Sequence, residues 1–198
     1  MISFPRDLEI SDAVPSIIDF GGVLRPATGA ELQKINRQGS RFKIAVQLPV
    51  ATSADAREIV SDLIDAKLEG GRIYYPLQYE NQGYPGQPVV DGAEQSGKTL
   101  RIRGLTPNYA VKKGYWLSLE DASGQHYLYN VRAHGIATSD GRLTIPISPM
   151  HRKPLPDGAR VHIADPQVEG LIDGDEQSWH LALAGLVDSI SFTIEEAR

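Results

Sequence analysis

The chain of 198 residues contains no cysteine. Disulfide bonds, thiolate metal sites and a cysteine nucleophile are therefore excluded. The chain also lacks any apolar run near the ~20 residues that a membrane-spanning helix requires. Its first ten residues, MISFPRDLEI, include acidic side chains and no apolar segment, unlike a secretory signal peptide. We therefore expect a protein that is made in the cytoplasm and does not insert into a membrane.

The chain also has fewer basic than acidic residues. The chain has 20 lysines and arginines against 25 aspartates and glutamates, which gives a formal net charge of −5. A general basic surface for nucleic acid is therefore excluded, although a local basic patch is not. Hydrophobic residues make up 41% of the chain, which is enough to build a folded core.

Most of the chain is cut into short segments of alternating polarity by its 19 glycines and 13 prolines. In the segment RFKIAVQL, Phe42, Ile44 and Val46 fall on one side, and Arg41 and Lys43 fall on the other. This period of two residues is typical of a half-buried strand. The end of the chain alternates in the same way, and we expect its strands to pair with the first ones.

Helical spacing occurs in one segment, residues 53–68. Ser53 is the expected N-cap, and Gly70 supplies a stop. The sequence therefore predicts a mainly β protein with a single helix.

The domain organisation follows from where the short strands gather. Five short strands lie close together in the second half of the chain, and turn signals separate them. A set of this kind fits a small closed barrel of OB-like size. We therefore expect a split β domain, residues 1–84 and 170–198, interrupted by an inserted small β barrel at residues 85–169. The five strands expected in the insert are residues 99–105, 115–119, 126–131, 143–147 and 160–163.

One stretch, VVDGAEQSGKTLRIRG, matches the phosphate-binding loop G-x-x-x-x-G-K-[ST] through Gly92, Gly97, Lys98 and Thr99. A phosphate loop needs a helix to begin at its Lys-Thr end, because the amides and dipole of that helix bind the phosphates. Apolar and basic residues alternate after Thr99, and this alternation predicts a strand. We therefore expect no nucleotide hydrolysis.

Other chemical sites find no support in the residue spacing. The chain has no G-x-S-x-G nucleophile elbow. The acidic cluster Asp173, Asp175 and Glu176 lacks the rest of a calcium loop. We expect no enzyme, no cofactor and no metal site. Metal-ligand spacing is also missing among the five histidines, which are His126, His134, His151, His162 and His180.

Several phrases resemble, in their order and spacing, small tail proteins of long-tailed bacteriophages. They are FPRDLEIS, PVVDGAEQSGKTLRIRGLTPNYAVKKGYWLSLED, YLYNV, RLTIPISPMHRKPLPDGARV and SISFTIEEA. Tyr115 stands where aspartate is common in that group, so we assign no polar role to this position. The resemblance is densest over residues 85–163. The shared positions are Gly92, Ala93, Gln95, Gly97, Leu100, Gly104, Pro107, Lys113, Gly114, Tyr115, Trp116, Leu117, Tyr129, Val131, Ile147, Pro149 and Arg152.

The chain is most similar to the distal tail proteins of siphophages, and this resemblance implies a structural virion protein of the tail tip, or baseplate. In that group a tail-tube-like β domain (a β sandwich or barrel with a flanking helix) forms a ring, usually a hexamer. The ring joins the tail tube protein to the baseplate hub proteins, and a barrel projects outward. DNA would pass through the channel without specific binding, because an acidic wall repels phosphates.

The strand patterns suggest where copies would meet in such a ring. Candidate elements are the strand at residues 41–48, the loop at residues 25–40 and the strand at residues 190–196. The candidate interface residues are Arg25, Arg41, Phe42, Lys43, Ile44, Val46, Ile190, Phe192, Ile194 and Glu195.

A second function is compatible with the same sequence. Small β barrels with exposed aromatic rings bind carbohydrate, and a barrel at a tail tip could contact the host cell surface. Trp116 and Tyr127 would be the platforms on which a sugar stacks. Exposure of these two rings distinguishes this alternative from a purely structural role.

Overall fold

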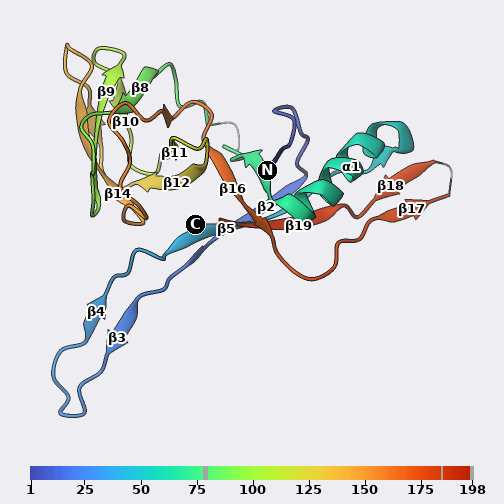
Figure 1. The fold of residues 1–198 in the computed structure, drawn as a ribbon, viewed down its shortest axis with the longest axis horizontal. Coiled ribbons are helices and arrows are strands. Elements are labelled where there is room, and N and C mark those ends of the chain that lie inside the picture. The colour runs from blue at the N-terminus through green and yellow to red at the C-terminus, as the bar shows by residue number, and fades with distance from the viewer. Residues whose placement is uncertain (78–79, 184, 197–198) are drawn as a thin grey trace.

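The computed structural model describes residues 1–77, 80–183 and 185–196. Over these residues the chain is mainly β with a single helix and a nearly closed, barrel-like sheet (Figure 1), which confirms the expected fold class. Within this described part of the chain, no helix has the length and apolarity needed to cross a lipid bilayer.

The first of two large sheets, which we call the main sheet, has six strands. β1 pairs with β7 in parallel, and every other neighbouring pair is antiparallel. The last strand of the chain lies between β5 and β16, so the ends of the sequence build one sheet. In spatial order the strands are β1 (Ile2–Ser3), β7 (Gly71–Tyr74), β16 (Gln167–Ile172), β19 (Ser191–Glu196), β5 (Arg41–Gln47) and β2 (Asp12–Ile18).

The helix α1 (Ser53–Glu69) covers one face of the main sheet and buries Ala56, Leu63 and Ala66 against it. Its N-cap is Thr52, whose extended backbone lets its Oγ1 accept a hydrogen bond from the amide of Asp55 at 3.3 Å. The expectation of Ser53 as N-cap was therefore wrong by one residue, because Ser53 is already helical.

The second large sheet curls into the barrel. A bridge between Val89 and Arg160 brings its first and last strands together, so that the sheet is nearly closed. The five expected strands are all present, and β8 is a sixth. In spatial order they are β15 (Val161–His162), β11 (Trp116–Glu120), β12 (His126–Val131), β14 (Leu143–Ser148), β9 (Thr99–Leu105) and β8 (Gly86–Val90).

Three small ladders complete the described strands. One lies on the barrel, one extends the region around α1, and one forms a ribbon that leaves the body of the molecule (Figure 1). In that order they are β10 (Ala110–Val111) with β13 (Gly135–Ile136); β6 (Ala51–Thr52) with β17 (His180–Ala182) and β18 (Leu186–Asp188); and β3 (Gly22–Leu24) with β4 (Gln33–Ile35).

Two hydrophobic clusters form the core, one inside the barrel and one between the main sheet and α1. The barrel also contributes to the second cluster through Leu128 and Trp116. The Trp116 ring lies 5.1 Å from that of Phe42 and 4.4 Å from that of Tyr75, between centroids. The predicted domain boundaries stay a prediction, but the two parts are packed together at this junction.

A buried ion pair fixes the same junction. Glu196, at the end of β19, is 2% exposed. Its two carboxylate oxygens accept hydrogen bonds from the backbone amides of Leu128 and Phe42, each at 2.7 Å. The guanidinium of Arg152 lies 2.5 Å from the same carboxylate and 4.9 Å from the centre of the Tyr127 ring. Glu196 of the main sheet therefore binds the barrel through the Leu128 amide and Arg152, beside the apolar contacts of Trp116.

Candidate interaction surfaces

The loop that matched the phosphate-binding motif is occupied by contacts of the fold itself. Thr99 opens the strand β9, as the alternation predicts. The amide of Gly92 donates to the carboxylate of Asp157 at 2.7 Å, and this carboxylate also pairs with Arg103. The negative charge beside this amide therefore comes from Asp157 of the same chain.

Gln95 holds the same loop from inside. It is 6% exposed, and its Nε2 donates to the carbonyls of Asp91 at 2.9 Å, Gly92 at 3.1 Å and Arg101 at 3.1 Å. Its Oε1 accepts a hydrogen bond from the amide of Arg101 at 2.7 Å. This buried side-chain amide forms hydrogen bonds with four backbone groups, so the glutamine of the Gly-Ala-x-Gln phrase has a structural role in holding the loop.

Six of the predicted interface residues lie inside the chain's own core. They belong to the cluster that packs between the main sheet, α1 and the barrel residues Leu128 and Trp116, so their side chains offer no surface to a neighbouring molecule. This is a correction of the expected interface. Alternation shows which side chains share a face of a strand, but α1 decides which face is covered. The six residues are Phe42, Ile44, Val46, Ile190, Phe192 and Ile194, all at most 7% exposed.

The other predicted residues lie on the surface. Arg41 forms an ion pair with Glu195, and its guanidinium lies 4.7 Å from the centre of the Phe20 ring. Lys43 forms an ion pair with Asp173. The hydrogen bond from Lys43 lowers the pKa of the Asp173 carboxyl, so this pair stays charged at neutral pH.

These ion pairs belong to an uncovered surface that we call the open face. It is the side of the main sheet opposite α1, because residues paired across neighbouring strands share a face. Within the described residues no element covers it, and Val14 and Leu171 are 58% and 59% exposed. Carboxylates outnumber cations there. The open face comprises Asp12, Val14, Arg41, Lys43, Leu171, Asp173, Asp175, Glu176 and Glu195.

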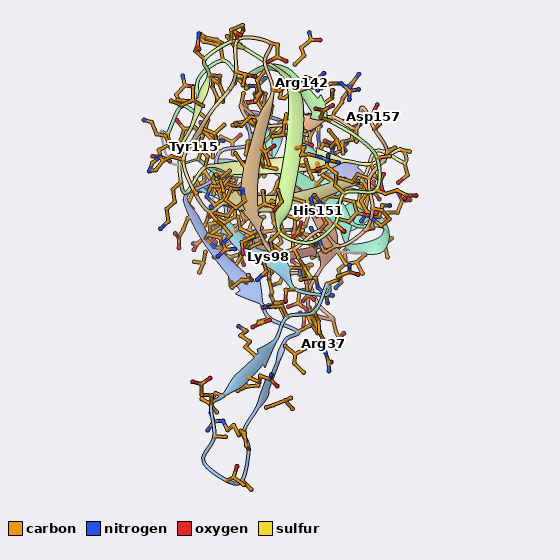
Figure 2. All side chains as sticks on the ribbon, turned by 90° about the vertical axis from the view of Figure 1, so that its left-hand side faces the viewer. Arg37, Lys98, Tyr115, Arg142, His151 and Asp157 are labelled. Atoms are coloured by element: carbon orange, nitrogen blue, oxygen red, sulfur yellow. The ribbon has the colours of Figure 1, made fainter. Side chains whose placement is uncertain are left out.

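The ribbon that contains β3 and β4 is a second uncovered surface, and we call residues 20–39 the arm. It projects from the body between β2 and β5 (Figure 1), and Arg37 lies where it meets the body (Figure 2). Leu24 and Ile35 share one face of the ribbon and are 52% and 43% exposed, while Leu32 is 64% exposed. None of these three side chains belongs to either hydrophobic cluster.

The arm also differs from the rest of the chain in charge. It carries Arg25, Lys34 and Arg37 against the single carboxylate Glu31, a net charge of +2. Since the whole chain carries −5, the rest of the molecule carries −7. Lys34 is paired with Asp19 at 2.7 Å, so the remaining positive charge of the arm comes from Arg25 and Arg37, and it favours contact with a negatively charged surface.

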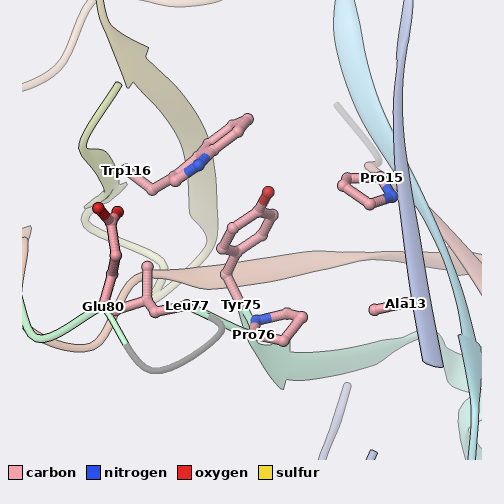
Figure 3. A pocket seen from close by; sticks show the side chains of 7 residues that line it. All are labelled: Ala13, Pro15, Tyr75, Pro76, Leu77, Glu80 and Trp116. Carbon is pink, nitrogen blue, oxygen red and sulfur yellow. The ribbon is translucent and has the colours of Figure 1, made fainter. Parts of the chain in front are cut away.

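The predicted sugar platforms are not exposed rings. Tyr127 is 2% exposed inside the barrel, and Trp116 packs against Tyr75 beside a pocket of about 200 Å³ (Figure 3). Pockets that enclose small ligands usually measure ~300–1,000 Å³. The pocket is lined by Ala13, Pro15, Tyr75, Pro76, Leu77, Glu80 and Trp116.

Comparison with known proteins does not indicate a function for these surfaces. A scan against models of protein families finds no match for this chain, and a search of curated proteins finds no match either. The expected membership among distal tail proteins therefore stays a prediction. The open face and the arm are the two uncovered surfaces that bear on function.

Proposed function

We propose that the chain is a structural component of a phage tail tip. Its copies would form a ring, with six copies as the number that the resemblance implies. The ring would join the tail tube to the baseplate hub around the channel through which DNA passes. The phrases shared with distal tail proteins support this proposal, and the observation that carries it is the unpartnered arm.

The arm supports assembly because its two strands, by themselves, form too small a structure to be stable. An isolated two-stranded hairpin is at best marginally stable in water. This one exposes Leu24, Leu32 and Ile35, which would be buried if another molecule covered them. A second copy is the partner that its charge favours, because the arm carries +2 and the rest of each chain carries −7.

The arm is long enough to serve as the contact between neighbouring copies of a ring. An arm that reaches from one copy onto a different surface of the next makes a head-to-tail contact, and repeated contacts of this kind form a ring where the rotation between copies closes. Direct pairing along the free edge of β2 is less suitable. Pro15 lies in that strand and has no N–H to donate to a neighbouring strand.

The open face is the surface that we assign to the channel wall. With α1 on the outside of the ring, the opposite side of the main sheet would point to the axis. Asp12, Asp173, Asp175 and Glu176 would then line the channel, together with Glu195. An excess of carboxylates over cations repels phosphates, so DNA would move past without being held.

The test is to remove the arm without touching the main sheet. Ile18 and Arg41 already pair across β2 and β5, so an Asn-Gly turn can replace residues 19–40 between them. We expect the wild-type chain to form a closed oligomer, measured by light scattering after size exclusion and by negative-stain images. The armless variant should be a monomer with an unchanged far-UV circular dichroism spectrum.

A pair of milder variants separates the apolar contact from the length of the arm. Leu24→Ser combined with Ile35→Ser removes two side chains from one face of the ribbon, and we expect it to weaken assembly. Leu68→Ser is the matched control, because Leu68 is 79% exposed on α1 and belongs to no proposed contact. The proposal fails if the wild-type chain is a monomer at micromolar concentration, or if the armless variant still forms the ring.

A further inference from the structure

Three chemically active side chains meet on neighbouring strands of the barrel. Glu120 lies directly opposite His126 across β11 and β12, and His162 belongs to β15 on the other side of β11. One ligand atom from each residue lies within 4.8 Å of the other two. Their spacing along the chain gives no sign of this cluster, because strand pairing alone brings them together.

The cluster has nearly the dimensions of a metal site. The Nε2 of His162 lies 2.9 Å from a carboxylate oxygen of Glu120, and the two histidine rings are 4.8 Å apart between centroids. Zinc binds nitrogen and carboxylate oxygen at about 2.0–2.2 Å, so tetrahedral ligand atoms lie roughly 3.4 Å apart. Side-chain rotations that move these atoms by about an ångström would therefore complete the set.

His126 is already oriented by a hydroxyl. Its Nδ1 lies 3.3 Å from the Oγ of Ser118, and the same Oγ accepts a hydrogen bond from the amide of Gln167 at 3.0 Å. Ser118 can accept from the Nδ1–H of His126 as well, which leaves the Nε2 lone pair for a metal. Histidine ligands commonly use their second nitrogen in this way to fix the ring.

The surroundings suit a cation. His126 is 3% exposed, and burial favours the neutral imidazole that binds metals. Two positive charges lie nearby: Arg160 beside Glu120, and Arg72, which is paired with Glu169 at 3.5 Å. Glu169 also accepts a hydrogen bond from the amide of His126 at 3.2 Å, so a second carboxylate lies beside the cluster.

We propose that Glu120, His126 and His162 bind one divalent transition metal ion of the zinc type. Two imidazoles and one carboxylate leave a fourth position for water or another ligand. β15 pairs with β11 through only two residue pairs, Ser118 with His162 and Leu119 with Val161. A metal ion held by β11, β12 and β15 would strengthen this short connection and hold the barrel closed.

The experiment uses the full chain without a histidine tag, after removal of metals with EDTA. Cobalt(II) is the probe, because tetrahedral cobalt absorbs visible light, and zinc affinity is then measured by calorimetry. We expect one metal ion per chain and a rise in Tm on binding. His162→Gln and Glu120→Gln should each weaken binding at least tenfold. Both side chains are 25% exposed, so these variants should fold, which circular dichroism checks.

His180→Gln is the matched control. His180 Nδ1 also lies 2.8 Å from a carboxylate, that of Asp188, but no second histidine accompanies this pair in the described structure. The control should bind metal as the wild-type chain does. The proposal is overturned if the wild-type chain binds no metal ion at micromolar concentration, or if His162→Gln and Glu120→Gln bind as tightly as the control.

Discussion

His151 shows how a single residue can carry a pH response in this barrel. It is 1% exposed, and its Nε2 lies 3.0 Å from the carbonyl of Thr99, to which it donates. Its Nδ1 has no hydrogen-bond partner among the described residues. Burial lowers the pKa of His151, and the contact with Thr99 opposes this only in part. The folded protein therefore disfavours the charged imidazole.

This gives a stability change of known sign. Because the folded pKa of His151 lies below the unfolded value of ~6.5, the unfolded chain binds more protons at mildly acidic pH. The stabilising contribution is complete above that pH and is lost as the pH falls below it. Urea unfolding in EDTA from pH 7.5 to 4.5 should show a smaller loss of stability in His151→Gln than in the wild-type chain.

His134→Gln is the control for this measurement, because His134 is exposed on the barrel surface. Its profile should follow that of the wild-type chain. Parallel profiles for all three proteins would contradict the role given to His151.

Buried glutamines mark the limit of prediction at the residue scale. In sequence, Gln82 and Gln95 look like ordinary surface residues. In the structure, Gln82 donates to the carbonyl of Trp116 and accepts from its amide, both at 2.8 Å. Such roles depend on backbone groups far along the chain, so local patterns cannot predict them. The resemblance singled out Gln95, but only the fold gives its reason.

At the scale of elements, the start of α1 offers a direct comparison of two adjacent residues. Thr52 accepts from the Asp55 amide, whereas Ser53 is the first helical residue. Thr52→Ala should therefore lower the free energy of unfolding by about 1 kcal/mol. Ser53→Ala should change it by only a few tenths of a kcal/mol, because alanine is the better helix former. Urea unfolding measures both, and equal losses would contradict this assignment.

The elements were the part of the fold that the sequence predicted best. Alternation identified β5 and β9, and helical spacing identified α1, because local periodicity depends on which side chains are buried. Alternation also supported the expected pairing of the last strand with an early one, which the structure has as β19 with β5. The pairing of the strands within the barrel was not predicted. The register that sets His126 and His162 on either side of β11 is fixed by the whole barrel, so residue spacing gave no sign of the candidate metal site.

At the scale of the whole molecule, the open face decides how the proposed ring treats DNA. Asp175→Lys with Glu176→Lys changes the formal charge of the chain from −5 to −1 and places four lysines or arginines on that face. We expect this variant to retain double-stranded DNA at low salt and to release it as salt rises. The wild-type ring should retain none, as measured by fluorescence anisotropy.

Glu58→Lys with Asp65→Lys is the matched control, because it makes the same change of charge on exposed positions of α1. We expect it to bind DNA much more weakly than the open-face variant. Equal binding by the two variants would mean that net charge alone matters, and the open face would then not be the channel wall.

The place of β19 in the main sheet has a consequence for how the chain matures on the ribosome. β19 is translated after every other described strand, yet it fills the gap between β5 and β16, and its Glu196 meets Leu128 of the barrel. The barrel strands, all translated earlier, can find one another while the nascent chain is still growing. The main sheet keeps a gap between β5 and β16 until β19 has been translated.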